Sequence, residues 1–244
     1  MSPYEAQAMY ELQRWQHEML RDPSMFNALA RRAQVKLNSF IPEKVHRAIT
    51  TAMKQMIRGV LFGAGYVSQK PLEQVPLEVR EGQVRGQIKY YQQAAAAEGG
   101  VTGAGGILLG LVDFPLLLGL KLKLLYDVAA LYGYDIKDYR ERVYLLHVFE
   151  LAFSSQEHRR NVYLYLADWE SQKLLLPEDI NAFDWRSLQQ EYRDYIDLAK
   201  MAQMIPIIGA PIGAVVNYRL ISRLGETAMN AYRLRWKEQG LLQH

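Results

Sequence analysis

Two uncharged, glycine-rich stretches limit what this chain can fold into more than any other feature of its sequence. GGVTGAGGILLGLV (Gly99–Val112) has six glycines in fourteen residues, and MAQMIPIIGAPIGAVVNY (Met201–Tyr218) has eighteen consecutive uncharged residues. A membrane-crossing helix needs about twenty predominantly apolar residues. Asp113 ends the first stretch, and Pro206 and Pro211 divide the second, so neither is a good membrane span. Both stretches must still be shielded from water, by the fold or by lipid.

The glycines of these stretches recur at helical spacing, which leaves two interpretations open. Spacings of three and four put glycines on one face of a helix, where a neighbouring backbone can approach closely. Both stretches are then buried helices, or they insert shallowly into a bilayer as re-entrant hairpins. The two interpretations coexist if buried hairpins swing out at a membrane. The glycines predicted to allow close packing are Gly103, Gly106, Gly110, Gly209 and Gly213.

Apolar residues recur with helical period along almost the whole chain, and no alternating pattern of useful strand length is present. The sequence therefore predicts an all-α fold, a single multi-helix bundle over residues 1–244 with the glycine-rich segments packed centrally. A basic helical part covers about residues 1–70, and a glycine-rich core part covers about residues 87–236. A chain of this length can bury a sizeable core.

Caps, prolines and glycines indicate where the helices begin and end. Ser154–Glu157 matches a capping box, Asp113-Phe114-Pro115 has the residues of a helix start, and Gly133 suits the left-handed position after a helix. Ser68–Val79 and Leu174–Phe183 are predicted connectors. The predicted helices are Tyr4–Leu20, one opening at Ser24, Pro42 to about Gly63, Ile88–Glu98, Pro115–Tyr132, Arg140–Phe153, His158–Trp169, one capped by Asp184, and Pro211–Trp236.

Positive charge is concentrated near the N-terminus. Pro23–Lys70 holds eight Lys and Arg against Glu43 alone, a net charge of +7 in a chain whose total is +3. Amphipathic basic helices suit an anionic membrane surface. The alternative interpretation is that these charges form an ordinary solvated helix face. Nucleic acid is not an expected partner, because no base-reading module accompanies the charge. The residues proposed for this surface are Arg31, Arg32, Lys36, Arg47, Lys54 and Arg58.

The absence of cysteine excludes disulfides, thiolate metal sites and a cysteine nucleophile. The first twenty residues include Glu5, Glu11 and Glu18 and no apolar run, so a secretory signal is not expected. Gly103–Gly106 fails as a dinucleotide loop, because Leu108 stands where the third glycine belongs and no strand precedes it. No phosphate loop or G-x-S-x-G nucleophile motif is present. We therefore predict no cofactor and no catalytic residue.

The histidines give no metal site. Glu43-x-x-His46 has the helical spacing of a di-iron ligand pair, but the second pair and the further carboxylates are missing. His147-x-x-Glu150 has the reversed order and is a poor substitute. Surface positions are predicted for His17 and His158.

The last predicted helix carries a continuous polar stripe at spacings of four and three. Such a stripe is either a solvated face or a polar seam against another helix or a ligand. Tyr192–Tyr195 and Asp197 are candidate partners for the seam. The stripe consists of Arg219, Arg223, Glu226, Asn230 and Arg233.

Taken together, four long stretches resemble the EcsC family of bacterial proteins. Those stretches are Thr102–Asp135, Glu150–Arg160, Asp184–Met201 and Ile205–Trp236, and FNALARRAQVKLNSFIPEKVHRAIT is also similar. The resemblance runs from about Tyr4 to Trp236. It implies an association with an ABC exporter, because the family is named for a protein encoded beside one, and it implies no agreed catalytic set. It also draws attention to Asp113, Glu226, Asn230 and Arg233 as motif positions.

Three functions are compatible with these observations. The first is a non-enzymatic helical accessory protein, cytoplasmic and peripheral to the inner face of the cytoplasmic membrane, whose partners are an anionic membrane surface, a membrane transporter or both. The second is a soluble carrier of a lipid or another apolar ligand, since many Tyr and Met residues offer an adaptable lining. The third is a hydrolase that uses Asp113 or Glu226, which requires two acid–base groups in one cleft.

Overall fold

The computed structural model describes residues 2–21, 43–62, 70–103, 106–154, 156–188 and 210–242. These residues form helices and connecting turns without a β-strand, which confirms the predicted all-α class. The elements are α1 (Pro3–Leu20), α3 (Glu43–Phe62), α4 (Leu77–Gly103), α5 (Gly106–Leu131), α6 (Tyr139–Phe153), α7 (Gln156–Ala167), α8 (Trp169–Leu175), the 3-10 turn η1 (Ile180–Ala182) and α11 (Ala210–Glu238).

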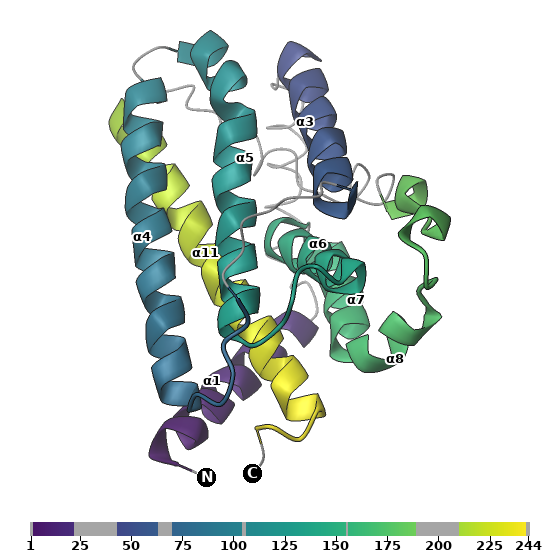
Figure 1. Ribbon diagram of the computed structural model, residues 1–244. Helices are drawn as coiled ribbons and strands as arrows, with labels where there is room; N and C mark the ends of the chain where they lie inside the picture. The colour runs from purple at the N-terminus through teal and green to yellow at the C-terminus, as the bar shows by residue number, and fades with distance from the viewer. Residues whose placement is uncertain are drawn as a thin grey trace.

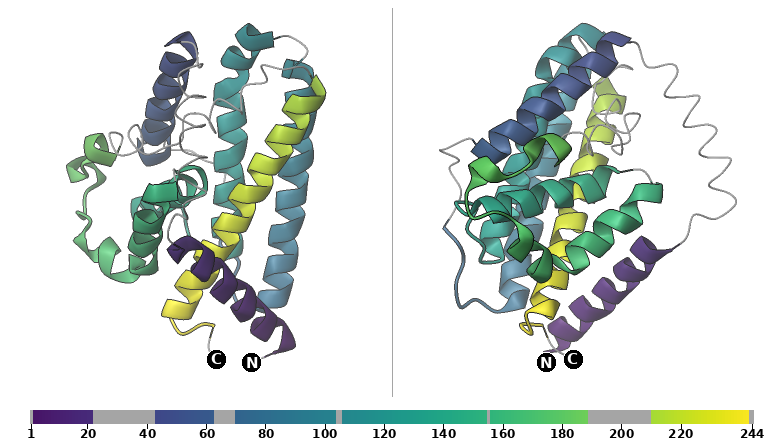
Figure 2. Two further views of the ribbon diagram at one scale, coloured as in Figure 1. Left: turned by 180° about the vertical axis from the view of Figure 1, so that it is seen from behind. Right: turned by 90° about the vertical axis from the view of Figure 1, so that its right-hand side faces the viewer.

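Three long helices organise the molecule. α4 and α5 lie side by side in opposite directions, and α11 packs along α4 as it crosses behind them (Figure 1). α6, α7 and α8 lie to one side of this trio, α3 packs on α5 and α6, and α1 crosses the lower part of α4 and α11. Figure 2 shows the same arrangement from behind and from the side, with both chain termini at one end of the molecule.

The first helix has nearly the predicted bounds because its cap is strong. The Ser2 hydroxyl accepts the Glu5 backbone N–H at 3.1 Å, and the Ser2 backbone N–H donates to the Glu5 carboxylate at 2.6 Å. Pro3 occupies the first turn, where its missing N–H has no cost. Met9 and Leu12 are buried and fix α1 against the body of the molecule.

α4 begins at Leu77, eleven residues before the predicted start at Ile88. Gly82 and Gly86 lower the helix propensity of this part, and that was the reason for expecting a later start. The helix nevertheless starts at Leu77, because its opposite face carries buried side chains at spacings of four and three. These are Leu77, Glu81, Val84, Ile88, Tyr91 and Ala95.

The predicted helix start at Asp113-Phe114-Pro115 is wrong. α5 begins at Gly106 and continues through Pro115 without interruption. A proline inside a helix removes one hydrogen bond and costs about 3 kcal/mol. A helix pairs the other backbone groups of this uncharged segment internally, and this outweighs the bond that the proline removes. The other end is as predicted: Leu131 is the last helical residue, and Gly133 has φ +92°.

Around α7 the predicted bounds need correction. Ser154, predicted to open the helix, instead closes α6, and its backbone N–H donates to the Glu150 carbonyl at 2.7 Å. α7 then begins at Gln156, two residues early. The predicted helix through Trp169 is broken at Asp168, because Trp169 opens α8 and is itself fully buried.

The C-terminal predictions hold where they can be compared. Asp184 is a helix cap, since its carboxylate accepts the Ser187 backbone N–H at 3.1 Å. That helix beyond Leu188, the predicted helix opening at Ser24 and the first half of the second glycine-rich stretch lie outside the described residues. α11 (Ala210–Glu238) matches the predicted Pro211–Trp236 within two residues at each end.

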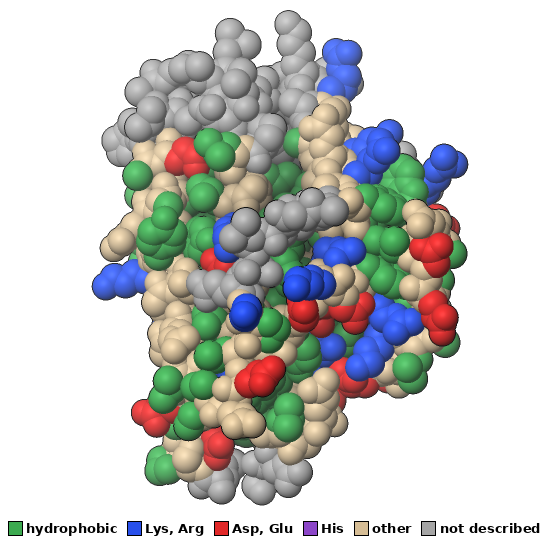
Figure 3. Space-filling model, viewed as in Figure 1, with side chains coloured by type: hydrophobic (Ala, Val, Ile, Leu, Met, Phe, Trp, Pro, Cys, Tyr) green, Lys and Arg blue, Asp and Glu red, His purple; other side chains and the backbone are tan. Residues whose placement is uncertain are grey.

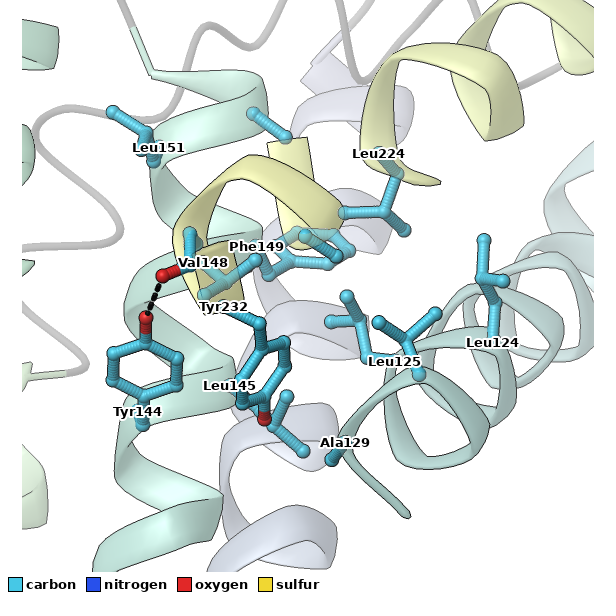
Figure 4. Close-up of a cluster of buried hydrophobic side chains, with 14 of the residues drawn as sticks. Leu124, Leu125, Ala129, Tyr144, Leu145, Val148, Phe149, Leu151, Leu224 and Tyr232 are labelled. Atoms are coloured by element: carbon cyan, nitrogen blue, oxygen red, sulfur yellow. Dashed lines mark hydrogen bonds between the residues drawn. The ribbon is translucent and has the colours of Figure 1, made fainter. Parts of the chain in front are cut away.

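The core lies where α5, α6 and α11 meet (Figure 4). Burial of such side chains stabilises the fold by about 25 cal/mol per Å² of apolar surface. Tyr144 places its hydroxyl inside this core and donates to the Ala231 carbonyl at 2.8 Å, so this polar group is paired despite its burial. The labelled members are Leu124, Leu125, Ala129, Tyr144, Leu145, Val148, Phe149, Leu151, Leu224 and Tyr232.

One close approach between helices occurs at a glycine that was not predicted for this role. A Cβ added at Gly225 of α11 would lie 2.6 Å from Ile88 Cγ1 of α4, which is shorter than real contacts allow. Only glycine fits at this position without a shift of Ile88. The side-chain surroundings of the predicted Gly103, Gly106, Gly110, Gly209 and Gly213 lie outside the described residues.

None of the helices, within the ranges described, combines the length and the hydropathy that crossing a membrane demands.

Candidate functional site

Arg233 on α11 belongs to a buried hydrogen-bond network in the described part of the molecule. Its guanidinium donates from Nε and Nη2 to both carboxylate oxygens of Glu81, each at 2.6 Å, and from Nη1 to Glu11 at 2.8 Å. The hydroxyls of Tyr132 and Tyr4 also donate to Glu81, at 2.9 and 2.5 Å. Burial alone would lower the pKa of Arg233, but its bonds to Glu81 outweigh burial and hold that pKa above its usual range.

The predicted polar stripe on α11 therefore sinks into the protein towards its C-terminal end. Arg219 and Glu226 are exposed, Arg223 and Asn230 are half-buried, and Arg233 is buried. The predicted partners Tyr192–Tyr195 and Asp197 lie outside the described residues. The stripe is thus partly a solvated face and partly a seam, and the seam is made with α4 and α1.

Two residues further along, Arg235 forms a second buried network. Its guanidinium donates to Glu141 of α6 at 2.5 Å and to Glu170 of α8 at 3.0 Å. Tyr232 donates to the other Glu141 oxygen at 2.6 Å, and the centre of the Tyr134 ring lies 4.0 Å from the Arg235 guanidinium carbon. Burial raises the pKa of Glu141 in spite of Arg235. These bonds fix the end of α11 to α6 and α8.

Beside the Arg233 network lies a cleft of about 580 Å³. Its walls come from α1, α4, α6, α7 and α11, so it forms only when distant parts of the chain have packed together. Arginines, glutamates and large apolar side chains make up most of its surface. The lining is Glu11, Arg14, Trp15, Glu18, Met19, Arg85, Leu151, Arg159, Arg223, Glu226, Thr227, Met229, Asn230 and Arg233.

The charges of this cleft differ in depth. Arg14, Glu18, Arg85 and Glu226 are exposed, so water solvates them. Glu11 and Arg233 are paired with each other, whereas Arg159 of α7 and Arg223 of α11 are half-buried cations in the wall. The lining of the cleft therefore has more positive than negative side chains, five arginines against three glutamates, and the exposed ones among them are solvated.

Arg159 is the least satisfied of these groups. Its Nε is fully buried and has no hydrogen-bond partner, and no hydrogen bond or ion pair to any described residue involves its guanidinium. Burial, and then the like charge of Arg223, lower the pKa of Arg159, while Glu18 opposes them. The wall thus holds a partly desolvated cation that the described part of the protein does not neutralise.

A second buried cluster corrects the prediction for His158, which is not a surface residue. His147 Nδ1 and His158 Nε2 each lie 3.0 Å from one oxygen of Glu150, and all three side chains are buried. Burial would raise the pKa of Glu150, but its bonds to the two histidines hold it below the usual range. Within the described residues, no group of His, Asp or Glu is arranged as a metal site.

The predicted basic surface is described in part. Arg47, Lys54 and Arg58 are exposed on one face of α3, opposite the buried Met53 and Met56. Figure 3 shows Lys and Arg side chains projecting from this side of the molecule, at the upper right. Arg31, Arg32 and Lys36 lie outside the described residues.

The structure does not test the two carboxylates proposed for hydrolysis together. Asp113 lies about two turns into α5 and Glu226 about four turns into α11, and both helices start at the same end of the molecule. The side chain of Asp113 lies outside the described residues, and Glu226 is exposed at the cleft. The hydrolase hypothesis stays a prediction.

Glu81 and Arg159 were not among the residues predicted from the sequence. Glu81 follows the predicted connector and was assigned to no helix, so the sequence did not predict that it lies on a buried helix face. Arg159 belongs to Glu150–Arg160, one of the stretches that carries the family resemblance, and that membership was the only signal. Neither residue can be linked to α11 by spacing, because each bond or cleft contact joins residues far apart in the chain.

The fold and the site define the class of protein: an all-α protein with a charged cleft between α1, α7 and α11. The model of the EcsC protein family matches residues 6–236, and the chain belongs to this family. It is 42% identical to "Protein EcsC" of Bacillus subtilis (strain 168), over 93% of this chain and 94% of that protein. It is 25% identical to "Uncharacterized protein YdbA" of the same strain, over 94% and 91% of the two chains. No solved structure matches the chain.

Proposed function

We propose that this protein is a non-enzymatic helical accessory protein that docks on the anionic inner face of the cytoplasmic membrane. One observation carries the proposal: helix ends that belong to the two uncharged glycine-rich stretches meet at the same end of the molecule, with α3 beside them. α4 ends at Gly103, and α5 and α11 begin at Gly106 and Ala210 at this end, opposite the chain termini (Figures 1 and 2). Residues about a hundred positions apart in the sequence thus lie at one end.

Apolar side chains near this end are open to solvent. Leu116 of α5 is 61% exposed, and Val215 and Tyr218 of α11 are 50% and 43% exposed. Exposed apolar side chains grouped near uncharged helix ends suit shallow burial at the boundary between head groups and acyl chains. Tyrosine is favoured at that depth, because its ring is apolar and its hydroxyl stays wet.

α3 supplies the electrostatic attraction. Arg47, Lys54 and Arg58 project from its outer face, as Figure 3 shows for this side of the molecule. Each Lys or Arg near an anionic membrane contributes about 1 kcal/mol of attraction. Three cations together with a few inserted side chains give reversible adsorption, which suits an accessory protein that acts at the membrane surface.

Flotation with lipid vesicles tests the proposal. The protein should rise with phosphatidylglycerol vesicles at low salt and stay at the bottom with phosphatidylcholine vesicles. In about 1 M salt, where the screening length falls to about 3 Å, flotation should be lost. A protein that does not float with phosphatidylglycerol vesicles at low salt rules out direct lipid docking.

A matched pair of variants locates the surface. Arg47→Glu/Lys54→Glu reverses two charges on α3 and should abolish flotation. Lys137→Glu/Lys237→Glu makes the same change in charge at the opposite end of the molecule and should float as the wild type does. Equal flotation of the two variants would contradict docking through α3.

A membrane transporter is the protein partner to expect, since the EcsC family is named for a protein encoded beside an ABC exporter. If the protein binds native inner-membrane vesicles but does not bind vesicles of pure lipid, docking is assigned to such a protein partner instead. The carrier hypothesis has no specific support, because the cleft of about 580 Å³ is lined mainly by polar and charged side chains.

A further inference from the structure

The cleft beside Arg233 has features that membrane docking through α3 does not use. It lies between α1, α7 and α11, away from the end of the molecule where α4 ends and α5 and α11 begin. Its lining has five arginines against three glutamates, Glu11 is engaged with Arg233, and Arg159 and Arg223 are half-buried. A partly desolvated cation that no described residue pairs with, such as Arg159, is costly to the fold, so its presence in a cleft indicates a ligand that supplies the missing charge.

The geometry of the donors narrows the class of ligand. A guanidinium presents a planar fork of N–H donors that matches the oxygens of a carboxylate or a phosphate. Here two guanidiniums come from two different helices, α7 and α11, and a third, Arg14 of α1, stands at the rim. Donors that come from separate helices suit a tetrahedral group with three free oxygens better than a planar group with two.

The remaining wall is apolar and partly aromatic. Trp15 and Met19 of α1 are half-buried, and Leu151 and Met229 are buried at 2% and 8% exposure. Trp15 is held in place by an edge-on contact with Tyr163, with ring centroids 5.6 Å apart. A ligand in this cleft thus meets both arginines and apolar side chains.

We infer that this cleft is a binding site for a phosphate group, in which Arg159 and Arg223 hold the phosphate oxygens and the wall around Trp15 receives the organic part of a phosphate monoester. The exposed Glu18 and Glu226 at the rim repel anions in general, so entry requires a ligand that reaches the inner cations. The inference is independent of membrane docking and survives if docking fails.

Calorimetric titration of the full chain tests the inference with three probes. Inorganic phosphate represents the free ion, adenosine monophosphate a nucleotide, and dihexanoyl phosphatidic acid a soluble lipid with a phosphate head group. Hexanoate serves as the carboxylate comparator. We expect saturable binding of at least one phosphate probe at millimolar or lower concentration. The tightest of the three identifies the source of the phosphate, and each of these results supports the site.

Arg159→Met is the decisive variant, and Arg160→Met is its matched control. Both remove one positive charge from neighbouring positions of α7, but Arg160 is exposed and does not line the cleft. Arg159→Met should weaken phosphate binding by about tenfold or more, the effect of losing a charge-assisted hydrogen bond. Arg160→Met should change binding by less than about twofold.

Folding and binding are separated in the same variants. Arg159 has no hydrogen bond to a described residue, so its replacement should leave the melting temperature of the ligand-free protein at or above the wild-type value. Failure of all three phosphate probes to bind, binding by Arg159→Met equal to that of the wild type, or hexanoate binding as tight as that of the phosphates overturns the inference.

Discussion

At the scale of single residues, some buried charged side chains have several hydrogen-bond partners, and others have almost none. Glu150 lies between two histidines, and Glu81 accepts hydrogen bonds from two tyrosines and two arginines. Lys121 of α5 is the opposite case, since it is fully buried and its amino group donates only to the Leu117 carbonyl of its own helix, at 3.3 Å, among the described residues. Burial lowers the pKa of Lys121 to about 8, although the charge of Glu98 opposes this.

Replacement of Lys121 by Met should therefore stabilise the protein at neutral pH. A lysine with a pKa near 8 when folded and 10.5 when unfolded binds fewer protons in the folded state between these values, so wild-type stability rises with pH across that window. Below pH 8 the full cost applies, about 3 kcal/mol. We expect Lys121→Met to raise the free energy of unfolding at pH 7 by about 2–3 kcal/mol, and the gain should shrink towards pH 10.

Urea unfolding at several pH values measures this effect. Lys89→Met is the control, because Lys89 is exposed on α4 and its replacement should stay within about 0.5 kcal/mol of the wild type. A Lys121→Met variant less stable than the wild type at pH 7 would show that the buried amino group makes favourable interactions.

At the scale of elements, α4 and α11 pack closely against each other, and one glycine permits their approach. Gly225 faces Ile88 so closely that any side chain must displace it, whereas Gly119 of α5 is exposed and has open space where a Cβ would lie. The two positions are both inside helices, so their intrinsic helix propensities are the same. Only the neighbouring helix distinguishes them.

Alanine should therefore have opposite effects at the two glycines. Gly119→Ala should stabilise the protein by about 0.5–1 kcal/mol through helix propensity alone. Gly225→Ala gains the same propensity but overpacks the interface, at a cost of about 1–3 kcal/mol, and should be destabilising. Adding Ile88→Ala should make the Gly225→Ala change tolerable, which chemical unfolding of the double variant checks against Ile88→Ala alone. Stabilisation by Gly225→Ala by itself would contradict the close approach.

At the scale of the whole molecule, α11 is the element through which the others are joined. Arg233 bonds it to α4 and α1, and Arg235 bonds it to α6 and α8. These bonds connect residues up to 222 positions apart in the chain. Because Arg233 and Glu81 are 1% and 0% exposed, removal of either one leaves the other buried without its main counter-charge.

Arg233→Met should cost about 3–5 kcal/mol of unfolding free energy, the penalty for breaking a buried pair from one side. Glu81→Gln/Arg233→Met should recover much of this loss, because Gln still accepts a tyrosine hydroxyl and no charge stays buried. Arg219→Met, an exposed arginine on the same helix, is the control. Amide exchange should also accelerate in α1 of Arg233→Met, since α1 loses its Glu11 bond. Additive losses in the double variant would argue against a coupled pair.

The sequence by itself determined the all-α class, the bounds of α1 and α11 to within two residues, the cap at Asp184 and the end of α5 before Gly133, because these depend on periodicity and on residues next to one another. The sequence also determined that the chain belongs to the EcsC family. The tertiary structure alone decided that Pro115 stays inside a helix, that His158 is buried and that Gly225 packs closely against Ile88 of α4. It decided too that Glu81 and Glu11 bond to Arg233 of α11 and that Arg159 lines a cleft together with residues of α11, since pairing across space leaves no trace in spacing along the chain.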